Sequence, residues 1–283
     1  MTNQNVLYSS KSLLSKNLTR KRILIWTFFL WIQLLFFPKQ VHCQDFMAIQ
    51  KTKKIQFLTG YIQQKELNLM PKVHQGFQYA VEYQADRELN HLSRFQARLG
   101  FSPLTTSWET SGFSANLQIQ GGYFHLFPIL KNQSWKVWAG PFGNLKYNTS
   151  FYPNWDESHL FWANQLQTGV SSRIEYFLQT KPRSLFWDFN LPVIGLLSRP
   201  NIERNYKIDD FSFGGIVKAM HFQPQFIGLI NNFQVHTRIG YNFPIGKKNQ
   251  AHFGYQFDHI QVSTNYSNQF IQSSHQIFFG INL

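Results

Sequence analysis

Cysteine, charge and long apolar segments are all scarce in this chain of 283 residues. The single cysteine is Cys43, so no internal disulfide framework can hold the chain together. Charged residues make up 14%, against about 25% in ordinary soluble domains. The only long apolar run, residues 23–37, is shorter than the ~18 residues that a spanning helix needs, and the mean hydropathy is -0.29. A disulfide-stapled domain and a bundle of transmembrane helices are therefore both excluded.

The apolar run has the layout of a secretory signal. A basic segment ending at Arg22 precedes it, and the helix breaker Pro38 follows it. We expect cleavage after Cys43, with Val41 at the −3 position, so that Gln44 begins the mature chain. Two alternatives are an uncleaved inner-membrane anchor and lipidation of Cys43.

Removal of residues 1–43 changes the charge of the chain. This segment holds six of the 27 basic residues and none of the 14 acidic ones, so the net charge falls from +13 to +7. The remaining basic residues form no cluster of the kind that nucleic-acid binding requires, and no nucleic-acid partner is expected. We interpret residues 44–283 as one domain, with residues 44–54 as a short periplasmic lead-in.

Aromatic residues are abundant, at 17%, and the mature chain alternates apolar and polar residues. Tyr79, Val81 and Tyr83, for example, alternate with Ala80 and Glu82. Successive side chains of a β-strand point to opposite faces, so each such segment has one apolar and one polar face. The strand candidates are residues 55–61, 73–85, 91–102, 112–124, 134–148, 159–178, 184–193, 211–222, 232–243, 251–262 and 270–283.

Serial amphipathic strands of this length, behind an export signal, predict an all-β fold: a closed antiparallel transmembrane β-barrel. Bacterial barrels have an even number of strands, and the candidates number eleven. We expect the miscounted strand between Leu185 and Phe222, where the apolar residues 191–197 do not alternate cleanly. We expect twelve strands, with ten as the alternative.

Aromatic residues in the apolar phase gather near strand ends, as they do in the interfacial girdles of membrane barrels. The predicted girdle consists of Tyr61, Tyr83, Phe101, Tyr123, Trp135, Tyr147, Tyr176 and Tyr241. The chain ends inside a strand that places Ile277, Phe279, Ile281 and Leu283 on one face.

With these features the chain resembles Gram-negative outer-membrane β-barrel proteins. The resemblance implies insertion into outer-membrane lipid after export. It also implies that the barrel-assembly machinery recognises the C-terminal strand, although Leu283 stands where that class usually ends in an aromatic residue. The oligomeric state is left open.

The polar phase carries seven basic and four acidic residues that we expect to face the lumen. These are Glu82, Arg94, Arg98, Lys136, Lys146, Arg173, Glu175, Asp188, Lys218, Arg238 and Asp258. Two functions follow: a narrow, anion-leaning small-solute channel, or a structural surface barrel whose lumen is filled by paired charges. No cofactor is expected.

A third hypothesis is an outer-membrane lipid-modifying hydrolase or acyltransferase with a Ser/His site on the barrel wall. Its candidate residues are His91 with Ser93, which share one strand face, and His252 with Asp258, which share another. No nucleophile motif surrounds Ser93, and no metal-binding spacing is present.

Overall fold

The computed structural model describes residues 50–66, 70–106, 109–153, 160–178, 183–199, 212, 214–215, 218, 221, 224–246, 249–264 and 268–283. Within these ranges no helix has the length and apolar character to cross a membrane. The expected signal and its cleavage point at Cys43 lie outside the described residues.

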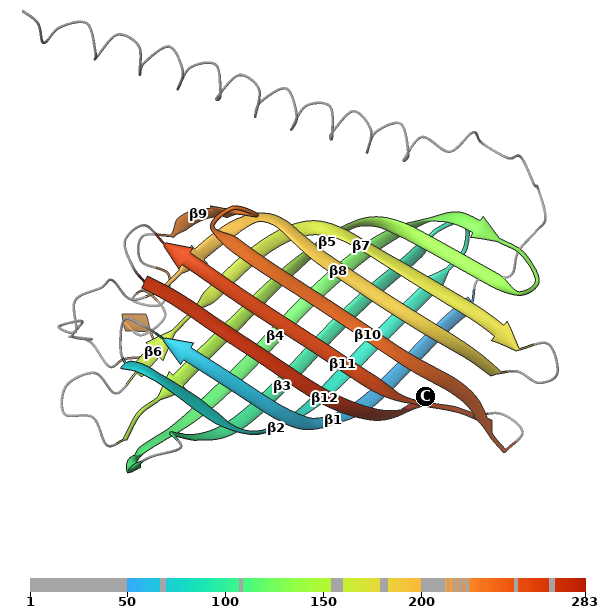
Figure 1. The fold of residues 1–283 in the computed structure, drawn as a ribbon. Coiled ribbons are helices and arrows are strands. Elements are labelled where there is room, and N and C mark those ends of the chain that lie inside the picture. The colour runs from blue at the N-terminus through green and yellow to red at the C-terminus, as the bar shows by residue number, and fades with distance from the viewer. Residues whose placement is uncertain are drawn as a thin grey trace, which may run out of the picture. The chain divides into compact units, whose positions relative to one another are not determined.

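The described chain forms twelve antiparallel strands, ten of which close into one barrel (Figure 1). The strands are β1 (Gln50–Glu66), β2 (Met70–Glu88), β3 (Leu92–Thr106), β4 (Glu109–Lys131), β5 (Trp135–Phe151), β6 (Leu160–Trp162), β7 (Asn164–Leu178), β8 (Arg183–Ser198), β9 (Gln225–Gly228), β10 (Asn232–Ile245), β11 (Asn249–Thr264) and β12 (Asn268–Asn282).

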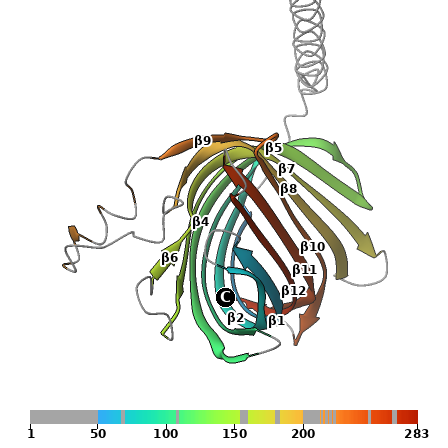
Figure 2. The same cartoon turned by 60° about the vertical axis from the view of Figure 1, so that its left-hand side comes forward.

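The ring runs β10-β11-β12-β1-β2-β3-β4-β5-β7-β8, and pairing of β10 with β8 closes it. Figure 2 shows these strands curving around an interior. The closed all-β barrel is therefore confirmed, with the alternative number of ten strands. The preferred number of twelve is wrong for the barrel, because β6 and β9 lie outside the ring.

The short strands β6 and β9 pair with the ends of β5 and β8, beyond the residues of β5 that pair with β7 and the residues of β8 that pair with β10. Lys146 of β5 pairs with Gln165 of β7, and Thr149 pairs with Trp162 of β6 in the same register. Between the two strands, the backbone N–H of Ala163 still donates to the Asn148 carbonyl at 2.8 Å. β9 likewise pairs with residues 194–197 at the end of β8.

The apolar residues 191–197 belong to β8, and a β-bulge explains their broken alternation. Gly169 pairs with Pro192 and Thr168 pairs with Ile194, so Val193 has no partner on β7. An extra residue in one strand reverses the faces beyond it. Pro192 accordingly points inward, whereas Ile194 points outward.

Two of the expected boundaries are wrong. Residues 211–222 were expected to form a strand, but the residues described there include Gly214, Gly215 and Lys218 in helical conformation. Residues 50–54 were expected in the lead-in, but they begin β1, because β2 extends far enough to pair Gln50 with Glu88.

The two ends of the barrel differ in their connections. At one end the strands are joined by the short connections 89–91, 132–134, 179–182 and 246–248, and both β1 and β12 reach the same end. We call this the short-turn end. The opposite end carries the long connections around β6 and β9 and is called the loop end (Figure 1).

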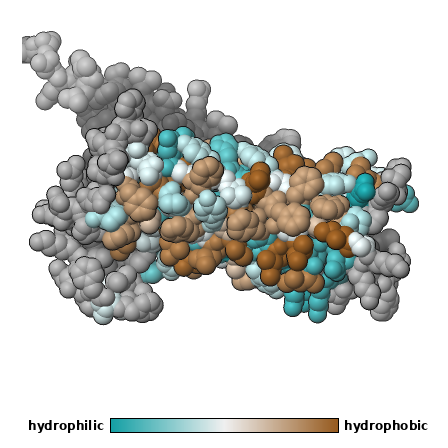
Figure 3. Space-filling view, turned by 90° about the horizontal axis from the view of Figure 1, so that it is seen from below, coloured by the Kyte–Doolittle hydropathy of each residue, from teal (hydrophilic) through white to brown (hydrophobic). Residues whose placement is uncertain are grey.

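The outer surface is apolar over much of its height, as Figure 3 shows for one side. Val81, Leu99, Leu117 and Ile239 are all exposed on this surface. Large apolar side chains facing out, with polar side chains facing in, are the inverse of a soluble domain and suit contact with lipid.

Candidate functional site: the interior of the barrel

The interior is lined by the polar phase of the strands. Of the eleven charged residues expected in the lumen, the structure buries seven inside the barrel: Glu82, Arg94, Arg98, Lys146, Arg173, Asp188 and Arg238. Lys136, Glu175 and Asp258 also face inward and keep side-chain exposures of 15–20%. The expectation for Lys218 is wrong: it is exposed and in helical conformation, between β8 and β9 in the chain.

An ion pair crosses the middle of the interior. Arg238 on β10 donates to both carboxylate oxygens of Glu82 on β2, at 2.8 and 2.9 Å. Gln56 donates to Glu82 at 2.7 Å, and Gln256 accepts from Arg238 Nε at 3.0 Å. Glu82 is 0% exposed, so this bidentate pairing and its added hydrogen bonds are what make the buried charge tolerable.

A second charged group lies toward the short-turn end. Arg173 Nη1 lies 2.9 Å from Asp188 Oδ1, and Arg94 Nη1 lies 3.3 Å from the same oxygen. Arg94 Nε also reaches Asp86 Oδ1 at 2.9 Å. The guanidinium of Arg173 stacks over the ring of Phe186, 4.7 Å from its centroid. Two arginines and two aspartates therefore neutralise one another across the lumen.

A third group surrounds Asp258 on β11. Its carboxylate contacts His236 Nδ1 and lies 3.6 Å from Arg98 Nη1. Gln256 donates to the other carboxylate oxygen at 2.6 Å. Glutamine side chains extend the network: Gln276 donates to Gln78 at 2.6 Å, and Gln78 donates to Gln118 at 2.8 Å. These contacts join strands from opposite sides of the barrel.

Toward the loop end the interior becomes apolar. A buried cluster, which we call the apolar seal, consists of Tyr152, Phe161, Ala163, Leu197, Ile227, Ile260, Val262 and Phe270. Beside it Arg199 pairs with Glu66 at 2.6 Å, with both side chains almost fully buried. The sequence prediction missed this feature. The sequence pattern that could have predicted it is on β11, where the inward residues change from the polar Gln256 and Asp258 to the apolar Ile260 and Val262.

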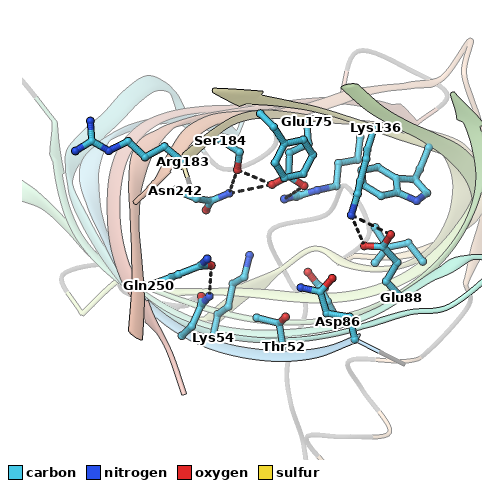
Figure 4. A pocket seen from close by; sticks show the side chains of 16 residues that line it. Thr52, Lys54, Asp86, Glu88, Lys136, Glu175, Arg183, Ser184, Asn242 and Gln250 are labelled. Carbon is cyan, nitrogen blue, oxygen red and sulfur yellow. Dashed lines mark hydrogen bonds and ion pairs between the residues drawn. The ribbon is translucent and has the colours of Figure 1, made fainter. Parts of the chain in front are cut away.

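At the short-turn end the interior opens into a cavity of about 220 Å³, which we call the mouth cavity (Figure 4). Charged and amide side chains from β1, β2, β5, β7, β8, β10, β11 and β12 surround it. Between the mouth cavity and the apolar seal, Gln78, Glu82 and Gln256 expose 1% or less of their surface. Side chains that lined a continuous water-filled channel would be exposed to it.

The four catalytic candidates are not brought together. His91 and Ser93 lie on the outer side near the short-turn end, where the His91 ring packs 4.4 Å from that of His125. Desolvation and the nearby His125 and Arg87 lower the pKa of His91. His252 and Asp258 face the interior, six positions apart on β11 and therefore ~20 Å from one another. Neither pair has the geometry of a nucleophile and its base.

Over the described ranges no three His, Cys, Asp or Glu side chains gather as a metal site. All eight predicted girdle residues lie in the outward phase of their strands, half-buried or exposed. Trp135 and Tyr176 pair across β5 and β7 beside the short-turn end, with ring centroids 4.6 Å apart.

The closed antiparallel barrel, its apolar outer surface and its unequal ends define the class of Gram-negative outer-membrane β-barrel proteins. The resemblance inferred from the sequence is thus confirmed at the level of class.

Comparisons with known proteins name no family for this chain. No family model matches the chain, and no curated protein matches it. The translocator domain of autotransporter NalP from Neisseria meningitidis is 8% identical, with coverage of 84% of this chain and 89% of that one and a TM-score of 0.42. Neisserial surface protein A is 9% identical, with 83% and 98% covered and a TM-score of 0.35. A mutant of the TodX monoaromatic hydrocarbon channel is 10% identical, with 84% and 90% covered and a TM-score of 0.30.

Proposed function

We propose that this protein is a structural or surface barrel of the outer membrane that does not conduct solutes. The interior of the barrel, which is filled by its own side chains, supports this proposal. Glu82 pairs with Arg238, Asp188 pairs with Arg173, and the apolar seal follows at the loop end.

Charge pairing supports this function over an anion-leaning channel. A selective pore presents uncompensated charge to water, so that ions of one sign gather in it. Here the cations Arg94, Arg98 and Arg238 each lie against a carboxylate at 3.6 Å or less. Inward carboxylates therefore neutralise most of the basic side chains that a solute crossing the barrel would meet.

Conductance in planar lipid bilayers tests the proposal. The purified barrel should insert and show no current steps above the leak of the bare membrane, while a known porin in the same apparatus shows them. A heat-dependent band shift on gels checks that the inserted protein is folded.

Stable current steps would instead support the channel. In that case the reversal potential under a salt gradient should indicate anion preference, and the double variant Arg94→Glu with Arg98→Glu should weaken or invert it. Steps that favour cations would contradict both the filled lumen and the charge argument.

We also propose the route by which the barrel reaches the membrane. Residues 1–43 act as a cleaved export signal, and N-terminal sequencing of the mature protein should begin at Gln44. The assembly machinery then recognises β12, whose outward residues Ile277, Phe279 and Ile281 alternate in an exposed apolar row. A mature protein that retains residues 1–43 in the inner membrane would contradict the export step.

A further inference from the structure

The mouth cavity contains a buried cation that the network does not neutralise. Lys54 lies on β1 in the inward phase and exposes only 8% of its surface. Its side chain extends into the cavity in Figure 4, where no dashed line reaches it. Over the residues that the structure describes, the side-chain ammonium of Lys54 has neither a hydrogen bond nor an ion pair.

Each carboxylate that lines the cavity is already held by another group. Asp86 accepts from Arg94 at 2.9 Å. Glu88 lies 3.1 Å from the ammonium groups of both Lys131 and Lys136.

The third carboxylate, Glu175, is held in the same way. It accepts from the Ser184 hydroxyl at 2.6 Å and from the Asn242 amide at 3.3 Å. The ammonium of Lys54 is therefore buried beside carboxylates that are already engaged, and burial of an unpaired charge is costly.

From this geometry we propose that the mouth cavity is a binding site for a small oxyanion of the phosphate type, with Lys54 as its principal ligand. The site does not depend on whether the barrel conducts, because it opens at the short-turn end and requires no passage through the interior.

The neighbouring groups favour an oxyanion over a monatomic ion. Thr52, on the same strand and face as Lys54, adds a hydroxyl to the wall of the cavity. Asn282 lies on β12, the neighbour of β1, and its amide donates to Gln250 of β11 at 3.0 Å. Amide and hydroxyl donors that converge around an ammonium can serve several oxygens at once. The cavity of about 220 Å³ has room for such a group.

Phosphorus NMR of inorganic phosphate, titrated with the folded full barrel in detergent, tests the site. Bound phosphate should broaden the resonance, and the effect should fall at least tenfold for Lys54→Met. Lys53→Met is the matched control, because Lys53 is the adjacent lysine on the exposed outer face. This variant should broaden the resonance as the unmodified protein does.

Acetylation of lysines in the unmodified protein gives a second measurement that does not require Lys54→Met to fold. Phosphate should slow acetylation of Lys54 several-fold and leave that of Lys53 unchanged, as measured by peptide mass spectrometry. Chloride at equal ionic strength should protect neither residue. Unchanged acetylation of Lys54 in saturating phosphate, or equal protection by chloride, would overturn the proposal. So would undiminished broadening with folded Lys54→Met.

Discussion

At the scale of single residues, most of the charges buried in the interior lie in ion pairs. Glu82 and Arg238 are 156 positions apart in the chain, yet they form a bidentate contact with almost no exposure to solvent. Removal of either partner leaves the other charge without compensation in a medium of low polarity. Such a loss costs more than the intact pair contributes relative to apolar residues of the same size.

We therefore expect Arg238→Met to lower the free energy of unfolding by about 3–5 kcal/mol, because it leaves the buried carboxylate of Glu82 without a counter-charge. The double variant Glu82→Leu with Arg238→Met should recover much of that loss, since it removes both charges. Urea unfolding of the barrel in lipid vesicles measures both. Equal destabilisation by the single and double variants would show that lost packing, rather than the unpaired Glu82 carboxylate, causes the loss of stability.

At the scale of the strand, alternation decides which side chains meet lipid, and depth in the membrane decides the penalty for a charge. The outward positions of β2 follow one another toward the short-turn end in the order Val81, Tyr83, Ala85 and Arg87. The natural sequence therefore already has a charged residue at the position nearest that end. Arginine near the midplane of a barrel is far more costly than arginine near an interface.

Val81→Arg should accordingly cost about 2–4 kcal/mol, whereas Ala85→Arg, four positions nearer the short-turn end on the same face, should cost about 0–1 kcal/mol. Unfolding titrations in vesicles, together with the yield of heat-shifted barrel in membranes, give the comparison. A similar cost at both positions would mean that β2 does not cross the membrane with this register.

Strands were predicted well from the sequence where their alternation was uninterrupted and poorly where it was not. The segments around Val81, Leu99 and Leu117 contain regular period two, which follows directly from the geometry of an extended backbone. Residues 191–197 lose that pattern because one extra residue at Val193 reverses the faces, and the sequence alone does not reveal a bulge. The strand expected at residues 211–222 is wrong as well, since Gly214, Gly215 and Lys218 are helical.

At the scale of the whole molecule, closure rests on the pairing of β8 with β10, which spans only the seven pairs from His236–Asn190 to Asn242–Ser184. The hydrogen bond from Trp187 Nε1 to Thr237 Oγ1, at 2.7 Å, joins the two strands on the outer face. This seam is where a ten-stranded barrel and a twelve-stranded barrel differ, because additional strands would separate β8 from β10.

A cross-link tests closure directly. Phe189 and Thr237 are directly paired, and paired Cα atoms lie ~4.5–5.5 Å apart, within the range of a disulfide. In a chain with Cys43 replaced, Phe189→Cys with Thr237→Cys should therefore form an intramolecular disulfide under mild oxidation, detected as a joined peptide by mass spectrometry. The control pair Ala97→Cys with Thr237→Cys, on distant strands, should remain reduced. A reduced Phe189–Thr237 pair in the folded protein would contradict the ten-stranded ring.

The sequence by itself determined the class of fold and the two faces of most strands, because period two is a local property that needs no knowledge of distant residues. It did not determine the number of strands in the ring, which depends on how β8 meets β10. Nor did it determine the pairing of Glu82 with Arg238, the apolar seal, or the unpartnered Lys54 in the mouth cavity. Only the tertiary structure decided these features. Each depends on which strands, and which side chains from distant parts of the sequence, lie next to one another in the closed barrel.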